Sequence, residues 1–397
     1  MLSRFIELSE RTIESVDTRY TRNQISLLSQ PERLIGIKGS RGVGKTTLLL
    51  QHAKSNLKIG TRLYVSLDNP FFAKNNLLEF VDEYVKNGGK HLLLDEVHHY
   101  KDWSVSLKHI YDNYKDLHII YTGSSLLHLT KGRADLSRRS ILSTLYGLSL
   151  REYINLTKGT DFPACSLDEI LSGHMDISRS INDKVKPVKE YNDYNQVGYY
   201  PFFLENRKTY HIKLMEIINQ VIESDLPLVA NINYSNVSRM KQLIQIIAES
   251  VPYKPNLEKL SGLTGLSINT LKDYLYYLNE AMLISLLRSD KKGISKLAKP
   301  EKIYLHHPNL MFCLATENSN QGSIRESFFF NQVKALFEVG YTDKGDFSVG
   351  KRHHFEIGGK NKKYRQIANI ENSYIAADDL ETGFKNTIPL WLFGFLY

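Results

Sequence analysis

The stretch RLIGIKGSRGVGKTTLLLQHAK, residues 33–54, decides the fold of this chain. It contains a short apolar run, a glycine-rich octet and a segment with leucine and alanine at helical spacing, which predicts a strand, a loop and a helix. The octet, residues 39–46, matches the pattern G-x-x-x-x-G-K-[ST] at every fixed position. Its glycines let successive N–H groups turn toward a phosphate, and the following helix adds the positive end of its dipole. The sequence therefore predicts a phosphate-binding loop.

The residues of this octet have different predicted tasks. The Lys45 ammonium can bridge the β- and γ-phosphates of a nucleoside triphosphate, and the Thr46 hydroxyl can bind Mg²⁺. We therefore expect ATP and Mg²⁺ as ligands. The expected nucleotide-binding residues are Gly39, Ser40, Arg41, Gly42, Val43, Gly44, Lys45, Thr46 and Thr47.

Two carboxylates follow a later apolar run. The segment LLLDE reads as a buried strand that ends in Asp95 and Glu96. This pattern predicts Asp95 as a Mg²⁺ ligand and Glu96 as the base that polarises an attacking water. The next strand ends in YTGSS, where Thr122 or Ser124 would lie beside the γ-phosphate and bind that water. A turn without a catalytic task is the alternative for these two residues.

Short apolar runs alternate with helical stretches around the octet. Besides the strand before the octet, RLYVSL (62–67), HLLL (91–94) and LHIIY (117–121) read as strands. Such alternation predicts an α/β fold, a P-loop NTPase with a parallel sheet covered by helices on both faces. We expect this core over residues 31–157, preceded by a helical segment over 1–30.

Three arginines lie in the segment GRADLSRRS, beyond the last of these strands. Arginine suits transition-state charge on a phosphoryl group because its planar fork donates several hydrogen bonds. Arg133, Arg138 and Arg139 are therefore candidates for catalysis, in the chain's own site or in that of a neighbouring copy. A solvated basic helix face is the alternative, and the sequence leaves the three cases open.

Composition limits the class of protein. The chain has 397 residues, with 51 Lys and Arg against 43 Asp and Glu, a formal net charge of +8. Its 42% hydrophobic and 24% charged fractions are typical of a globular protein and exclude wholesale disorder. No apolar run approaches a membrane span, and the first residues read as an amphipathic helix rather than a secretory signal. Two cysteines, Cys165 and Cys313, are too few for a disulfide framework, so we expect a cytoplasmic protein.

The rest of the chain predicts three further parts. Residues 158–236 contain helical pieces and an exposed connection, which we interpret as a helical lid. In residues 237–315, two helices joined by a turn over Gly262–Ser267 precede two strand-like runs around a lysine-rich loop, the order typical of a winged helix-turn-helix. Residues 320–397 begin with a helix over 325–339, and the β-rich runs HHFEI, SYIAA and LWLFGFL follow it.

Several stretches resemble a known family. The chain is similar to the bacterial and archaeal AAA-type ATPases with a C-terminal winged helix and a nuclease-like domain, in the segments GSRGVGKTT, YVSLDNP, LLLDEVHHYKDWSVSLKHIYD, YTGSSLL and LSLREYI. KIYLHHPNLMFCL and GSIRESFFFNQV resemble the passage from the winged helix into the last domain of that family. The resemblance implies an AAA-like core with ATP and Mg²⁺, and it gives Asp95 and Glu96 the roles stated above.

The last domain of that family is similar to restriction-endonuclease-like folds, in which two carboxylates hold Mg²⁺ and a lysine orients the water. The nearest equivalents here are Glu326, Asp346, Glu356 and Lys360, a candidate second metal site. The spacing from Glu356 to Lys360 does not fit one strand face, and the two glycines between them favour a bulge or a turn. An active nuclease and a degenerate fold that docks a partner or holds DNA are the two interpretations.

Two segments, residues 288–302 and 351–365, are rich in lysine and arginine. Clustered positive charge suits neutralisation of nucleic-acid phosphates, although ordinary solubility explains such loops equally well. The predicted recognition helix over 268–281 also carries Asp273 and Glu280, so we do not expect base-specific readout by it. DNA is thus a candidate partner through its backbone.

Three pairs of adjacent histidines invite a metal site. Neighbouring residues on a strand point to opposite faces, however, and no H-x-x-x-H spacing accompanies the pairs. We therefore expect no metal at His98–His99, His306–His307 or His353–His354.

These observations lead to one main hypothesis, an AAA-type ATPase that hydrolyses ATP with Mg²⁺ and thereby moves its C-terminal domains on DNA. A nucleotide-gated switch that turns over too slowly to matter and docks a protein is one alternative. A Mg²⁺-dependent nuclease controlled by ATP is another. A second copy of the chain is a further candidate partner, and a membrane is not expected.

Overall fold

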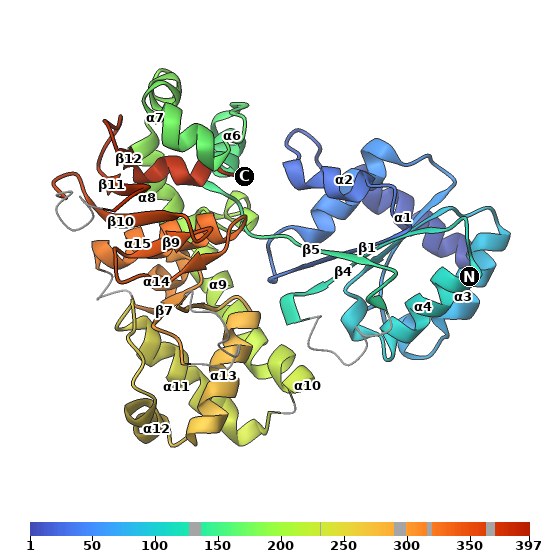
Figure 1. Ribbon diagram of the computed structural model, residues 1–397. Helices are drawn as coiled ribbons and strands as arrows, with labels where there is room; N and C mark the ends of the chain where they lie inside the picture. Colours follow the sequence, from blue (N-terminus) through green and yellow to red (C-terminus); the bar gives the residue numbers. More distant parts are fainter. Residues whose placement is uncertain (127–135, 231, 290–298, 316–319, 363–369) are drawn as a thin grey trace. The chain divides into compact units, whose positions relative to one another are not determined.

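The computed structural model describes residues 1–126, 136–230, 232–289, 299–315, 320–362 and 370–397 (Figure 1). The chain divides into two compact units, Met1–Gly147 and Leu148–Tyr397. The first unit includes the expected N-terminal segment and ends before residue 157, the expected boundary of the core. The described residues contain no helix that is both long and apolar enough to span a membrane.

A five-stranded parallel sheet forms the centre of the first unit. Its spatial order is β2-β3-β4-β1-β5, and the predicted parallel α/β sheet is therefore confirmed. The strands are short, and all but the edge strand β5 are largely buried, as a sheet with helices on both faces requires. They are β1 (Leu34–Gly39), β2 (Arg62–Ser66), β3 (His91–Asp95), β4 (His118–Ser124) and β5 (Ile141–Thr144).

Helices cover both faces of this sheet. From β1 the chain crosses to β2 at the far edge of the sheet, and it then returns in the opposite direction through β3 to β4. Because each crossover is right-handed, the helix after β1 covers one face of the sheet, and the helices after β2 and β3 cover the other face. Figure 1 shows α2 and α4 on opposite faces. The helical elements of the unit are α1 (Leu2–Ser15), η1 (Asn23–Ser29), α2 (Lys45–Asn56), η2 (Pro70–Ala73), α3 (Leu77–Lys86), η3 (Val97–His99) and α4 (Trp103–Asn113).

Helix α1 covers the edge strand β2. The Ser9 hydroxyl accepts a hydrogen bond from the backbone N–H of Tyr64 at 2.8 Å, which satisfies a donor of the strand edge. The buried Arg62 guanidinium on β2 binds Glu10 at 2.8 Å and Glu14 at 3.0 Å. The ring of Phe5 on α1 packs against aromatic rings of η2 and α3. The N-terminal segment is therefore part of the first unit.

The second unit begins with a helical part. Three of its helices, α11, α12 and α13, are followed by an antiparallel hairpin of β6 and β7. The helices are α6 (Leu150–Lys158), α7 (Leu167–Asn182), α8 (Pro187–Val197), η5 (Pro201–Leu204), η6 (Arg207–Thr209), α9 (Tyr210–Gln220), η7 (Val221–Asp225), α10 (Leu226–Ala230), η8 (Tyr234–Asn236), α11 (Val237–Ala248), α12 (Leu257–Thr264), α13 (Ile268–Glu280) and α14 (Pro308–Leu314), and the strands are β6 (Ile284–Leu287) and β7 (Lys302–Leu305).

A mixed five-stranded sheet completes the second unit. Helix α15 precedes it, and the strand order is β12-β11-β10-β9-β8, with β10, β11 and β12 parallel and β8, β9 and β10 antiparallel. The bounds are α15 (Gln321–Lys334), β8 (Val339–Gly340), β9 (Phe347–Val349), β10 (His353–Gly359), β11 (Ser373–Asp378), β12 (Thr387–Pro389) and η10 (Leu390–Phe395).

Two expectations for this last part were wrong. The helix expected over 325–339 ends at Lys334, and Val339 already belongs to β8. LWLFGFL is a 3-10 helix, η10, rather than a β-rich run. Pro389 has no N–H with which to continue the ladder, and the residues that follow are buried on all sides, so their apolar pattern carries no period.

Candidate functional site

The glycine-rich loop connects β1 to α2. Strand β1 ends at Gly39, and α2 begins at Lys45. Gly42 and Gly44 have φ values of 83° and 95°, a left-handed conformation that favours glycine. The loop therefore wraps around the N-terminus of α2, where backbone N–H groups and the helix dipole create a positive potential.

Lys45 lies inside this loop. Its side chain is 5% exposed, and its ammonium donates hydrogen bonds to the carbonyl oxygens of Gly39 at 3.1 Å and Ser40 at 3.2 Å. The same nitrogen lies 3.8 Å from Oε1 of Glu96. The lysine ammonium thus lies between the loop and the carboxylate at the end of β3, the position that the terminal phosphate of a bound nucleotide would approach.

Two buried polar atoms of the loop suggest an anion. Within the part of the chain that the structure describes, Ser40 Oγ and Arg41 Nη1 are buried and lack a hydrogen-bond partner. Buried donors without partners are costly, and a phosphate oxygen would satisfy both. The loop therefore fits a nucleotide phosphate through these donors as well as through its backbone.

The carboxylate of Asp95 is the centre of the hydrogen-bond network beside the loop. It is 2% exposed at the end of β3. Thr46 Oγ1 donates to its Oδ2 at 2.6 Å, Tyr64 OH donates to the same oxygen at 3.0 Å, and Thr122 Oγ1 donates to Oδ1. Hydroxyl and carboxylate oxygens are the ligands that Mg²⁺ prefers, so Thr46 and Asp95 fit this metal.

Glu96 follows in an uncommon backbone conformation, with φ of 50°. Burial raises the pKa of its carboxyl, while the nearby Lys45 ammonium opposes that increase. Its Oε2 lies 3.4 Å from Nδ1 of His98, whose pKa is lowered to about 3 chiefly by burial. A partly buried carboxylate with a raised pKa is suited to accept a proton from water.

Ser124 and Thr122 lie at the same edge of the sheet. The parallel register places Ser124 beside Gly39, at the start of the loop, and Thr122 beside Ile37. The Ser124 backbone N–H donates to His98 Nδ1 at 3.5 Å. The expectation that the end of β4 lies near the phosphate loop therefore agrees with the register.

Comparison with known proteins supports this interpretation. A family described as an AAA domain matches residues 31–154, which include every residue of the site described above. Residues 31–154 form an AAA domain. Nucleotide binding is implied by this AAA domain. Residues 188–321 match a domain of unknown function (DUF8612).

Individual relatives add little about function. An uncharacterised protein of Methanocaldococcus jannaschii is 27% identical over 286 residues, which cover 68% of this chain and 60% of that protein. RuvB of Thermotoga maritima, a Holliday junction branch migration motor, is 16% identical over 73% of this chain and 89% of its own, with a TM-score of 0.30. AMPPCP-bound DnaA of Aquifex aeolicus is 16% identical over 70% of this chain and 88% of its own, with a TM-score of 0.26.

Arg139, one of the arginines expected to assist catalysis, is paired away from the phosphate loop. Arg139 binds Asp112 at 2.9 Å and 3.0 Å, just before β5. The register starts with Ile141 beside Ile35, so Arg139 precedes the amino end of β5, and Gly39 lies about 13 Å of strand length beyond Ile35. Arg138 is exposed, and Arg133 lies outside the described residues. The structure does not bring Arg139 to the phosphate loop of its own chain.

Two contributors to the AAA domain site were missed from the sequence. Tyr64 reaches Asp95 because β2 and β3 are adjacent strands, a register that the run RLYVSL does not reveal. Arg22 is buried and donates to the carbonyl oxygens of Val43 at 3.3 Å and Tyr146 at 2.8 Å. It therefore ties the phosphate loop to the end of the first unit.

The second candidate site lies in the second unit and contains its own cations. Lys302 Nζ lies 3.3 Å from Glu326 Oε2 and 3.5 Å from Asp346 Oδ1. Tyr304 OH donates to the same Glu326 oxygen at 2.6 Å. Burial and the charge of Asp346 raise the pKa of Glu326, while Lys302 opposes this. The sequence predicted that Glu326 and Asp346 belong to one site, but it did not predict that Lys302 lies between them.

Glu356 has a different lysine from the one expected. Strand β10 continues through Gly359, Lys360 is exposed in the turn after it, and Lys362 folds back to bind Glu356 at 2.6 Å. A Cβ atom at Gly358 would lie 2.7 Å from Cγ of Lys362, so the glycine leaves room for this lysine. Of the expected bulge or turn, the turn is present after Gly359, and Lys362 rather than Lys360 lies beside the carboxylate.

The histidine pairs have different surroundings. His306 and His307 are fully buried, and the His307 ring stacks on Tyr199 at 3.9 Å, which assigns them to the core. His353 and His354 are neighbours on β10 and point to opposite faces, as expected. His98 and His99 lie in the 3-10 turn η3 instead of a strand, so the alternation argument does not apply to them.

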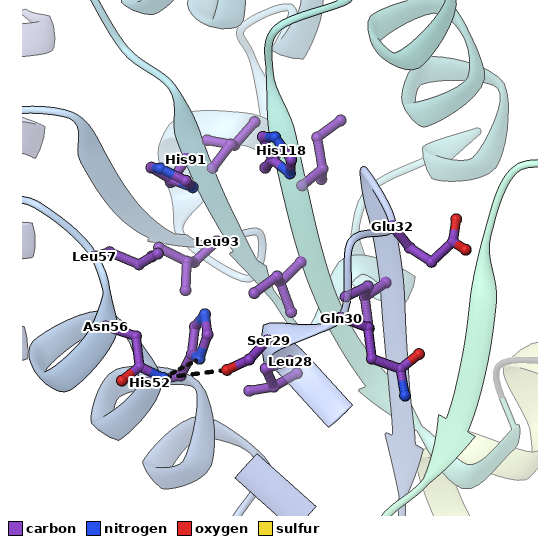
Figure 2. Close-up of a pocket in the computed structure, with 14 residues that line it drawn as sticks. Leu28, Ser29, Gln30, Glu32, His52, Asn56, Leu57, His91, Leu93 and His118 are labelled. Atoms are coloured by element: carbon purple, nitrogen blue, oxygen red, sulfur yellow. Dashed lines mark hydrogen bonds between the residues drawn. The ribbon is translucent and has the colours of Figure 1, made fainter. Parts of the chain in front are cut away.

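A separate cavity lies at the amino ends of the central strands of the AAA domain sheet (Figure 2). It has a volume of about 260 Å³, and its lining includes His52, His91 and His118. His91 and His118 begin β3 and β4, so the cavity lies at the amino ends of these strands, away from the phosphate loop. Burial, with a smaller contribution from His91, lowers the pKa of His52 to about 4. Burial also lowers the pKa of His91, so His52 and His91 are weakly basic and poorly suited to hold a phosphate.

Proposed function

We propose that the AAA domain binds ATP with Mg²⁺ and hydrolyses it. The observation that carries the proposal is the arrangement at the N-terminus of α2, where Thr46 lies 2.6 Å from Asp95 and Lys45 lies 3.8 Å from Glu96. This arrangement gathers the metal-binding oxygens, the phosphate-binding cation and a carboxylate base within one contiguous site.

Each residue has a proposed task. The loop amides, Ser40 and Arg41 hold the phosphates, and Lys45 leaves its two carbonyl partners to bridge the β- and γ-phosphates. Glu96 accepts the proton of the attacking water, for which its raised pKa is suited. Ser124 orients that water, whereas the Thr122 hydroxyl donates to Asp95 and acts on this carboxylate instead.

Mg²⁺ would be held by Thr46 and Asp95. Bound there, it would neutralise charge on the phosphate oxygens. Tyr64 and Thr122 keep the Asp95 carboxylate oriented through their hydrogen bonds, and in the protein alone Thr46 donates to the same group.

We further propose that hydrolysis moves the second unit on DNA. The order of α11, α12 and α13 followed by the antiparallel hairpin β6–β7 supports a winged helix. Gly265 with φ of 65° ends α12, and Ser267 caps α13, as a helix-turn-helix requires. The carboxylates Glu326, Asp346 and Glu356 already have lysine partners, which favours a DNA-holding or docking role for the last domain over cleavage.

The test is phosphate release from Mg-ATP by the full chain, with and without duplex DNA. We expect turnover by wild type, its loss in Lys45→Ala through weaker nucleotide binding, and its loss in Glu96→Gln with nucleotide binding kept. Lys58→Ala, at an exposed lysine beyond α2, is the matched control and should resemble wild type. Equal rates in all four proteins would refute the proposal, and tight binding with almost no turnover would favour the switch. An unchanged rate with DNA would refute only the DNA part.

A further inference from the structure

Three potential metal ligands meet in one turn after β3. Glu96, His98 and His99 each offer one ligand atom, and all three atoms lie within 4.8 Å of one another. Nδ1 of His98 is 3.4 Å from Oε2 of Glu96, and the centroids of the two imidazole rings are 4.3 Å apart. A metal on this nitrogen would replace its long hydrogen bond from the Ser124 N–H, at 3.5 Å. The side chains therefore converge on one point beside the phosphate loop.

The backbone explains this convergence. The N–H of His99 donates to the carbonyl oxygen of Glu96 at 3.1 Å, which closes a 3-10 turn. With three residues per turn, positions 96 and 99 lie above one another, and the left-handed φ of Glu96 starts the turn directly at the strand end. In a strand the adjacent histidines would diverge, whereas in this turn both rings lie near the same carboxylate.

We propose that Glu96, His98 and His99 form a binding site for a divalent transition metal, with Zn²⁺ as the preferred ion. Two imidazoles and one carboxylate suit Zn²⁺, Co²⁺ or Ni²⁺, whereas Mg²⁺ prefers oxygen ligands alone. At metal–ligand bonds of about 2.0 Å, tetrahedral ligand atoms are about 3.3 Å apart, close to the separation between Glu96 and His98. Rotation of the exposed His99 side chain closes the remaining distance and gives the ion access from solvent.

This metal would inhibit hydrolysis. Zn²⁺ on Glu96 occupies the lone pairs that would accept the proton of the attacking water, and it competes with Lys45, which lies 3.8 Å from the same carboxylate. The inhibition rests on the proposed ATPase function, but the metal binding does not. The Mg²⁺ site at Thr46 and Asp95 is made of other residues and should keep its ligand set.

The test uses Co²⁺ as a spectroscopic probe of the full chain, since tetrahedral Co²⁺ with nitrogen ligands absorbs visible light. We expect a saturable absorption at one Co²⁺ per chain, abolished by an equivalent of Zn²⁺. His99→Ala, an exposed substitution that leaves the fold intact, should weaken binding by at least about tenfold, and the double variant His98→Ala with His99→Ala should abolish it. His109→Ala, an exposed histidine on α4, is the matched control.

A second measurement separates this proposal from the ATPase. Lys45→Ala should keep the Co²⁺ absorption even though it loses hydrolysis. In active protein, the Zn²⁺ concentration that halves each variant's own phosphate release should rise at least about tenfold in His99→Ala. Absence of the absorption in wild type, or equal Co²⁺ affinity in wild type and the double variant, would overturn the metal site. Co²⁺ binding without Zn²⁺ inhibition would overturn only the regulatory part.

Discussion

His52 should make the first unit sensitive to acid. The imidazole is 3% exposed on α2, and its Nδ1 accepts a hydrogen bond from Asn56 Nδ2 at 3.1 Å (Figure 2). Burial, and secondarily His91, lowers its pKa from 6.5 to about 4. The unfolded chain therefore takes up a proton near pH 6.5 that the folded chain refuses until about pH 4. The stability contributed by neutral His52 is full above pH 6.5 and is lost as the pH falls toward 4.

The size of the effect follows from the pKa difference. Each unit of difference corresponds to about 1.4 kcal/mol, so the full loss below pH 4 is about 3 kcal/mol, of which about 2 kcal/mol appears between pH 7 and pH 5. His52→Gln removes the titrating group but keeps an oxygen that can accept from Asn56. We therefore expect the variant to resemble wild type at pH 7 and to lose about 2 kcal/mol less between pH 7 and pH 5.

Urea denaturation measures this difference. The chain has two tryptophans, and a Trp391→Phe background leaves the buried Trp103 of α4 to report on the first unit. His109→Gln on the exposed face of α4 is the matched control. If His52→Gln and its parent lose the same free energy of unfolding between pH 7 and pH 5, the burial argument for His52 is wrong. If His109→Gln reduces the loss equally, the effect does not come from the cavity.

Two further substitutions test single contacts of the first unit. Tyr64→Phe removes the hydrogen bond to Asp95 at 3.0 Å, which is worth about 1 kcal/mol. The Mg²⁺ concentration for half-maximal phosphate release should therefore rise about fivefold, and an unchanged Mg²⁺ titration would contradict this role of Tyr64. Arg62→Met breaks the ion pairs with Glu10 and Glu14 and should lower the free energy of unfolding of the first unit by about 2 kcal/mol in the same urea assay. A loss under about 0.5 kcal/mol would show that apolar packing alone holds α1.

The phosphate loop was predictable because its information is local. The glycines, Lys45 and Thr46 form the site with residues only a few positions away, and a strand before and a helix after complete it. The same holds for Asp95 and Glu96, which end an apolar strand. Their pairing with the loop needed only the general rule that carboxyl ends of parallel strands share one edge of a sheet.

Other features depended on residues far apart in the chain. Tyr64 reaches Asp95 only because β2 and β3 pair in one register. Arg139 lies away from the phosphate loop because it precedes β5, at the amino ends of the strands, whereas the loop follows the carboxyl end of β1. Lys302 enters the second carboxylate cluster from a hairpin that precedes α15. No local pattern specifies such contacts, since they arise when separate elements pack.

The sequence by itself determined the parallel sheet and the phosphate loop, because strand and helix periods and a glycine-rich turn act over a few residues. Only the tertiary structure decided which side chains surround the carboxylates. It placed Lys362 rather than Lys360 beside Glu356, turned the final apolar run into η10, and brought His98 and His99 together with Glu96. The physical reason is that such contacts depend on how separate elements pack and on backbone torsions that no residue pattern specifies, such as the left-handed φ of Glu96, which starts the turn holding His98 and His99.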